Sequence, residues 1–287
     1  MKPFPIPVVA LGAGSQTEDE QLDYLRLPKD MDTYRPPLLP EPEDLAGCAM
    51  ARQTLHSVLA LLDQAADGGP GGQIGLQALS PDDRDLLNQV LAEGEASAIV
   101  QDEEQPQLQT RIQESVFAGV WRLTTWDGDT LLADAIEVAP IPALLRQTAA
   151  ADVRHQPPWQ GTLPPNVQNA PLLVDEIRDH AARWRPGQPP HVVNLSLLPV
   201  SPEDIAFLDH ELGTGRVLLL SRGYGNCRIT NTRLPNCWRV VYYNSMDTVI
   251  LNTVEVVDMP EAAMAAREDL RDSHTRLLDV VSYFLPA

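Results

Sequence analysis

The stretch Leu79-Ser80-Pro81-Asp82-Asp83 reappears 121 residues later as Val200-Ser201-Pro202-Glu203-Asp204. Both copies have a helix-capping serine, a proline at the first helical position and acids that face the positive end of the helix. Two further stretches return in the same order: Trp121-Arg122-Leu123 as Trp238-Arg239-Val240, and Ile136-Glu137-Val138 as Val254-Glu255-Val256. A collinear series at a nearly constant offset indicates one structural unit that is built twice.

Each copy predicts the same order of elements. A helical spacing of apolar residues comes first, then a short strand, the capped helix and several runs with a period of two residues. These segments cover residues 43–63, 74–76, 80–92 and 96–138 in the first copy, and residues 172–184, 191–197, 201–212 and 217–257 in the second. We therefore expect an α+β fold made of two tandem repeats, each an α-β-α unit with an antiparallel β-meander and its helices on one face.

The chain divides into four predicted parts. Residues 1–46 contain eight prolines and little periodicity, which predicts an acidic, extended N-terminal arm. Residues 47–150 form the first repeat, and residues 166–287 form the second, which closes with helical spacing over 260–284. Residues 151–165 join the two repeats and are rich in proline, which is typical of a stiff, extended linker.

Acidic residues dominate the charge of the chain. The net charge is −19, and residues 47–150 alone hold 15 acids against 5 bases. Such a field repels phosphate backbones, so nucleic-acid binding is not expected. It attracts a basic partner and speeds the encounter, and Glu103 and Glu104 are candidate residues for this contact. The simpler alternative is that the acidic side chains only keep the protein soluble.

The sequence lacks the usual motifs of enzymes and cofactor sites. Neither a phosphate-binding nor a dinucleotide-binding glycine loop occurs, and the six histidines stand apart from one another in sequence, so no metal, cluster or other cofactor is expected. No run of 18 apolar residues occurs, so membrane insertion is not expected. Three scattered cysteines are too few for a disulfide framework and favour a reducing, cytoplasmic compartment.

Cys227 and Cys237 are absent from the first copy. They flank the turn at residues 233–236 on neighbouring predicted strands, so they could come close together. Arg228 and Arg239 stand next to them and would lower a thiol pKa, which makes a redox or iron–sulfur handling role conceivable. The alternative, two small cysteines that fill buried positions in a sheet, is the more common case.

A second feature of the later copy is a concentration of arginine and aromatic residues. No acid occurs between Glu211 and Asp247, whereas five arginines do. The composition is typical of protein interfaces, and the candidate partner-binding residues are Arg222, Gly223, Tyr224, Gly225, Arg228, Trp238 and Arg239. Gly223 and Gly225 would allow a turn that exposes Tyr224. The alternative is a twisted hairpin with arginines on its solvated side.

Several separated motifs together resemble the HupH/HyaF family of hydrogenase expression/formation proteins. They are Gly94-Glu95, Ile112-Gln113-Glu114, the stretch 117–122, and the series Arg222-Gly223-Tyr224-Gly225, Trp238, Asn244-Ser245, Ile250-Leu251-Asn252 and Glu255-Val256. The resemblance covers most of the chain and includes the doubled domain. It implies an accessory, non-catalytic protein for the maturation of uptake [NiFe] hydrogenases, and it supplies no catalytic residue.

The resemblance also implies partners. The client would be the iron–sulfur small-subunit precursor, held in the cytoplasm before twin-arginine export, and a thioredoxin-like accessory protein would act alongside. Two alternatives from other classes stay open: a thiol-based factor that uses Cys227 and Cys237, and a general scaffold unrelated to hydrogenase.

Overall fold

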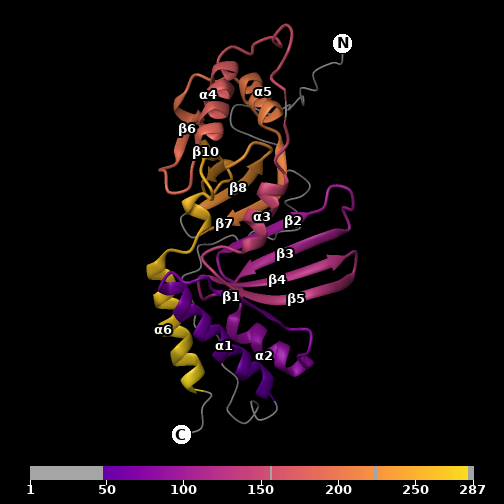
Figure 1. The fold of residues 1–287 in the computed structure, drawn as a ribbon, viewed down its shortest axis with the longest axis vertical. Helices are drawn as coiled ribbons and strands as arrows, with labels where there is room; N and C mark the ends of the chain where they lie inside the picture. Colours follow the sequence, from indigo (N-terminus) through magenta and orange to yellow (C-terminus); the bar gives the residue numbers. More distant parts are fainter. Residues whose placement is uncertain (1–47, 156, 223–224, 284–287) are drawn as a thin grey trace. The chain divides into compact units, whose positions relative to one another are not determined.

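The computed structural model describes residues 48–155, 157–222 and 225–283, whose fold is drawn in Figure 1. The chain forms two compact units. Of the described residues, the first unit contains those up to Arg146 together with those from Ala263 onward, and the second unit contains Gln147–Ala262. The predicted N-terminal arm, residues 1–46, lies outside the described residues.

The first unit is a five-stranded antiparallel sheet covered by helices. Its strands are ordered β1-β5-β4-β3-β2. Figure 1 shows α1, α2 and α6 together beside β1 and β5. The core between helices and sheet includes Leu55, Leu87, Ile136 and Leu277. The elements are α1 (Ala49–Ala66), β1 (Gly72–Gly75), α2 (Pro81–Leu91), β2 (Ala96–Gln101), β3 (Leu108–Glu114), β4 (Val120–Asp127), β5 (Thr130–Val138) and α6 (Arg267–Tyr283).

The second unit has the same element order and its own core. Its strands are ordered β7-β8-β9-β10-β6, again antiparallel. The core includes Val174, Ile177, Phe207 and Val254. The elements are α4 (Ala170–Arg183), β6 (His191–Asn194), the 3-10 helix η3 (Leu195–Leu197), α5 (Pro202–Leu212), β7 (Thr214–Ser221), β8 (Asn226–Thr232), β9 (Cys237–Tyr243), β10 (Val249–Val256) and the 3-10 helix η4 (Glu261–Ala263). The expected α+β class is confirmed.

The two capped helices make the same contacts in both units. Ser80 Oγ accepts a hydrogen bond from Asp83 N at 3.1 Å, and Asp83 Oδ1 accepts one from Ala51 N at 2.8 Å. The serine hydroxyl is the largest cause that lowers the Asp83 pKa. In the second unit, Asp204 Oδ1 likewise accepts from Ala170 N at 2.9 Å. Each aspartate therefore lies near the start of one helix and holds the start of the preceding helix against it by a hydrogen bond.

The two repeated tryptophans also occupy matching places. Trp121 is the second residue of β4 and Trp238 the second residue of β9, and both are buried. The Trp121 indole donates to the carbonyl oxygen of Ala139 at 3.0 Å, and the Trp238 indole donates to that of Val257 at 3.1 Å. The superposition of the two whole units stays a prediction.

The last helix of the chain belongs to the first unit. Leu270 and Leu277 of α6 lie in the core with α1 residues, and Arg276 Nη1 donates to Val116 O at 3.2 Å. Gly119, with a φ of +81°, lies so close to Leu270 that a Cβ atom there would overlap the leucine side chain. The compact units thus differ from the sequence repeats, because a helix that follows the second meander completes the first unit.

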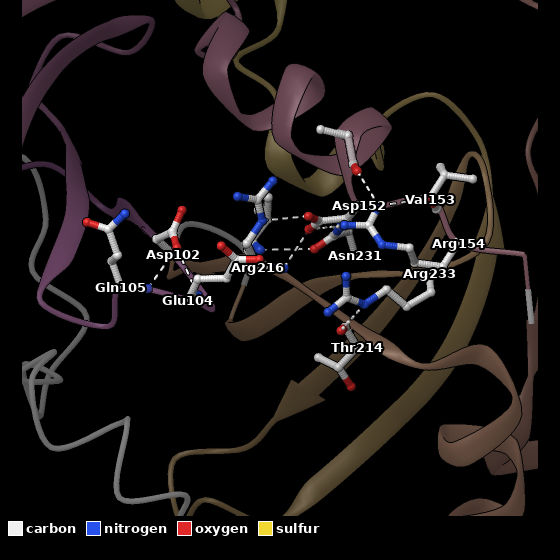
Figure 2. A network of polar contacts seen from close by, with 12 residues as sticks. Asp102, Glu104, Gln105, Asp152, Val153, Arg154, Thr214, Arg216, Asn231 and Arg233 are labelled. Atoms are coloured by element: carbon white, nitrogen blue, oxygen red, sulfur yellow. Dashed lines mark hydrogen bonds and ion pairs between the residues drawn. The ribbon is translucent and has the colours of Figure 1, made fainter.

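The second unit likewise includes residues from outside its own repeat, namely those from Gln147 through the predicted linker. A helix that the sequence did not predict, α3 (Ala143–Ala151), follows β5. Directly after it, the fully buried Asp152 accepts hydrogen bonds from Arg216 N and Arg216 Nε, both at 2.6 Å, and from Asn231 Nδ2 at 3.0 Å (Figure 2). None of the helices in the described parts of the chain has the length and apolar character needed to cross a membrane.

Candidate partner-binding surface

Residues 222–239, from the end of β7 to β9, include seven of the nine residues that the sequence proposed for partner binding. Gly223 and Tyr224 lie outside the described residues, and Arg222 is half-buried at the end of β7. Trp238 is only 2% exposed, and its indole also donates to Asp258 O at 3.1 Å. The expectation that Trp238 forms part of an accessible face is therefore wrong, because this side chain belongs to the core.

The arginines of the hairpin contact other residues of the second unit. Arg239 Nη1 lies 3.3 Å from Asp209 Oδ1, and the arginine side chain is 12% exposed. Burial lowers the Arg239 pKa, and the Asp209 carboxylate opposes that effect. The Arg228 guanidinium carbon lies 5.9 Å from the centre of the Tyr243 ring, within range of a cation–π contact.

Two more arginines in the acid-free stretch stabilise the unit from within. Arg216 pairs with Asp152, as described above, and Arg233 Nε donates to the carbonyl oxygen of Thr214 at 2.9 Å (Figure 2). Arg216 and Arg239 of this stretch therefore find their acid partners, Asp152 and Asp209, in other segments of the second unit. The arginines of this stretch share an intermediate burial, and Arg222 and Arg228, the two nearest to residues 223–225 in sequence, are kept as candidates for a partner.

The two cysteines of the second unit do not form a thiol pair. Cys227 lies opposite Tyr242, whereas Cys237 is next to the pair Asn231 and Trp238 at the other end of the ladder. Five residues of strand separate the two positions, which corresponds to about 17 Å. The expectation that the two thiols could come close is wrong, because both flank the turn only in sequence and the strand register moves them apart.

The cysteines are also poor thiolates. Burial raises the pKa of Cys227 to about 12, and it raises the pKa of Cys237 to about 12 as well. Arg239 lowers the Cys237 pKa, but this effect is smaller than that of burial. The expectation that neighbouring arginines activate these thiols is therefore wrong, because a nucleophilic or redox-active cysteine needs a lowered pKa and access to solvent.

The acidic candidates lie in the loop between β2 and β3. Glu103 and Glu104 are exposed. The loop has a defined turn, in which Asp102 Oδ1 accepts from the backbone N–H groups of Glu104 and Gln105, both at 2.9 Å (Figure 2). Residues 48–146 and 263–283 of the first unit hold 19 acids and 8 bases, against 12 acids and 9 bases in residues 147–262. The acidity of the chain is therefore concentrated in the first unit.

Glu114 is a titratable group that sequence reasoning did not single out. Its pKa is raised to about 7, mainly by burial and also by the charges of Glu95 and Asp269, and a hydrogen bond from Gly119 N to Glu114 Oε1, 3.0 Å long, opposes the increase. The acid stands at the end of β3, beside the turn that contacts α6. A single sequence gives no sign of this, because Asp269 comes from the other end of the chain.

A second missed group consists of Glu176, His180 and His191. The side-chain ligand atoms of these residues all lie within 4.8 Å of one another. His191 Nε2 and Glu176 Oε1 are 2.8 Å apart, and the His180 and His191 rings stack with centroids 3.5 Å apart. Part of the signal was present in sequence, because Glu176 and His180 have the i, i+4 spacing of one helix face. Only the fold brings His191 to them.

Comparison with known proteins places this fold among hydrogenase accessory proteins. Residues 49–156 and 167–284 each match the HupH_C family, described as the C-terminal conserved region of the HupH hydrogenase expression protein. The chain is 52% identical to the hydrogenase expression/formation protein HoxQ of Cupriavidus necator, over 99% of both chains. It is 42% identical to HupH of Rhodobacter capsulatus over 97% of both chains, and 31% identical to the hydrogenase-1 operon protein HyaF of Escherichia coli over 96% of both chains.

Proposed function

Because the chain belongs to the HupH family of hydrogenase expression/formation proteins, we propose that it is a cytoplasmic accessory protein for the maturation of an uptake [NiFe] hydrogenase. Its client would be the iron–sulfur small-subunit precursor before twin-arginine export, with a thioredoxin-like accessory protein as a further partner. It would act by binding and not by catalysis. The observation that carries the proposal is the family match over both repeats, at 52% identity to a hydrogenase expression/formation protein.

The charge of the first unit supports a role in capturing the precursor. A twin-arginine leader is basic, and residues 48–146 and 263–283 carry 19 acids against 8 bases. Opposite charges raise the rate of encounter, and salt weakens the effect because the Debye length is about 8 Å at physiological ionic strength. Glu103 and Glu104 are suited to this contact because both are exposed on a loop with a defined turn.

The half-exposed arginines of the second unit are the proposed contacts with the folded part of the client. Arg222 and Arg228 stand on either side of Tyr224 in the sequence, and arginine and tyrosine are enriched among the residues that dominate binding energy. Loss of such a contact acts mainly on the dissociation rate. The thiol-based alternative is not favoured, since Cys227 and Cys237 are buried and have raised pKa values.

The test is the kinetics of binding between purified full-length chain and purified small-subunit precursor. Reversal of both loop acids, Glu103→Lys with Glu104→Lys, should slow association about three- to tenfold at low salt and flatten the salt dependence. The matched control is Asp175→Lys with Glu261→Lys, which makes the same change in net charge at exposed positions of the second unit. This control should leave the association rate nearly unchanged.

A leaderless small subunit separates the two halves of the proposal. If precursor and leaderless subunit associate at the same rate at low salt, leader capture by the acidic first unit is refuted. If neither form binds, the small subunit is not the client. Loss of mature hydrogenase in a strain without the gene would then still support the broader role in hydrogenase maturation.

A further inference from the structure

Glu176, His180 and His191 converge from two rigid elements of the second unit. Glu176 and His180 lie one turn apart on α4, which is anchored in the core by Val174 and Ile177. His191 is the first residue of β6, and it is held in register opposite Val256 of β10. The three side chains therefore come together at a place that packing and strand pairing define, independently of any loop.

The chemistry of the trio matches a transition-metal site. Two imidazoles and one carboxylate form a donor set that Zn²⁺ accepts in proteins, with the fourth position left to water or to another ligand. Imidazole donors suit zinc, copper, iron and nickel, whereas calcium and magnesium prefer oxygen donors. Glu176 and His180 are exposed and His191 is half-exposed, so an ion from solution has direct access.

We propose that Glu176, His180 and His191 bind one divalent first-row transition ion such as Zn²⁺, with a coordination position open to solvent. The proposal does not depend on the hydrogenase-related function. It assigns a binding site to the α4–β6 end of the second unit, well apart in sequence from the hairpin proposed to contact the client.

Small side-chain movements are enough to admit the ion. Zinc bonds of about 2.0–2.2 Å at a tetrahedral angle place two ligand atoms about 3.3 Å apart. The present separation of His191 Nε2 and Glu176 Oε1 is 2.8 Å, which is a hydrogen-bond distance. The ion would take the place of the shared proton, and the gap would widen by a fraction of an ångström. The terminal torsions of glutamate and histidine are broad, so the exposed side chains can adjust.

The stacked rings require one imidazole, such as that of the exposed His180, to turn before both rings can hold the ion, because an imidazole nitrogen donates its lone pair in the ring plane and two parallel planes cannot both contain one ion. The His180 and His191 ring planes are 3° from parallel, with centroids 3.5 Å apart. A carboxylate–imidazole hydrogen bond between Glu176 and His191 has no need of a second imidazole at this distance. A site with two histidine ligands requires a second imidazole close to the first.

The experiment is a calorimetric titration of the full-length, tag-free chain with Zn²⁺ after treatment with a chelator. We expect saturable binding of one ion per chain at micromolar concentration. Changes in groups that merely support a ligand already cost about 10–100-fold in metal affinity, so Glu176→Gln should weaken binding at least tenfold. His180→Gln combined with His191→Gln should weaken it at least a hundredfold.

A matched control and a second readout keep the test decisive. His56→Gln combined with His274→Gln removes two histidines from α1 and α6 of the first unit, and it should leave the affinity unchanged. Circular dichroism and the thermal midpoint establish that each variant is folded. Bound Co²⁺ should give a visible absorption band that disappears in the His180/His191 variant only. No binding by the wild-type chain, or equal binding by the site and control variants, would overturn the proposal.

Discussion

Glu114 offers the sharpest test of the electrostatics of the first unit. Its carboxyl lies beside the turn that contacts α6, and burial is the main cause that raises its pKa to about 7. The unfolded chain has no such burial, so there the group ionises near its ordinary value of 4.5. Between these two pH values the folded state holds a proton that the unfolded state has released.

The sign and size of the effect follow from this difference. Protein stability decreases with rising pH wherever the folded state binds more protons than the unfolded state. The contribution of Glu114 is therefore fully present below pH 4.5, declines up to about pH 7 and is constant above that. A pKa increase from 4.5 to about 7 corresponds to at most about 3 kcal/mol of unfolding free energy.

The perturbation is Glu114→Gln, which keeps an oxygen that can accept the hydrogen bond from Gly119 N. Urea unfolding of wild type and variant is measured from pH 4 to pH 8, and the difference between their unfolding free energies is plotted. The variant should gain stability relative to wild type as pH rises, by up to about 3 kcal/mol at pH 8. Glu93→Gln, a nearby exposed acid, is the control and should give a flat difference. A flat difference for Glu114→Gln as well would refute the reasoning.

Three further predictions concern packing and the cysteines. Gly119→Ala forces a side chain onto a backbone with positive φ and against Leu270, and it should cost about 1–3 kcal/mol of unfolding free energy in urea; an unchanged midpoint would contradict the close contact with α6. Asp152→Ala removes the acceptor of three hydrogen bonds beside a partly exposed arginine and should cost about 3 kcal/mol, with a loss below 1 kcal/mol as the contrary result. Cys227 and Cys237 should react with a disulfide reagent at neutral pH only after unfolding, because their pKa values are about 12; rapid labelling of the native chain would count against their burial.

The parts of the fold that local chemistry determines could be predicted from the sequence. The Ser-Pro-acid-Asp stretches begin α2 and α5 as expected, because the cap and the proline act within one turn. The alternating runs became antiparallel strands for the same local reason. The placement of α3 and α6 could not be predicted, since a helical pattern shows which face is apolar but not which core will cover that face.

The candidate site residues show the same distinction between features set by local sequence and features set by contacts between distant segments. Glu103 and Glu104 are exposed, as acidic loop residues usually are. The role of Arg239 depends on Asp209 of α5, and that pairing is invisible in the sequence of the hairpin. The distance between Cys227 and Cys237 depends on strand register, which a turn alone does not reveal.

The two units differ where each includes a segment from outside its own repeat. In the second unit that segment contains Asp152, which accepts hydrogen bonds from the guanidinium of Arg216 and from the side-chain amide of Asn231. Both carboxylate oxygens of this buried acid accept hydrogen bonds, two from Arg216 and one from Asn231.

The sequence offsets of the repeat predict that acids occupy the matching positions of the first unit. By the sequence offsets, Glu95 stands where the second unit has Arg216, and Glu114 stands where it has Asn231. The segment that completes this unit brings another acid, Asp269, whose charge adds to that of Glu95 in raising the Glu114 pKa. Three carboxyls therefore gather where the other unit has an ion pair, and protonation of Glu114 relieves their repulsion. Burial is the main cause of the raised Glu114 pKa, and the charges of Glu95 and Asp269 add to it, which is why the sequence around Glu114 alone does not reveal the shift.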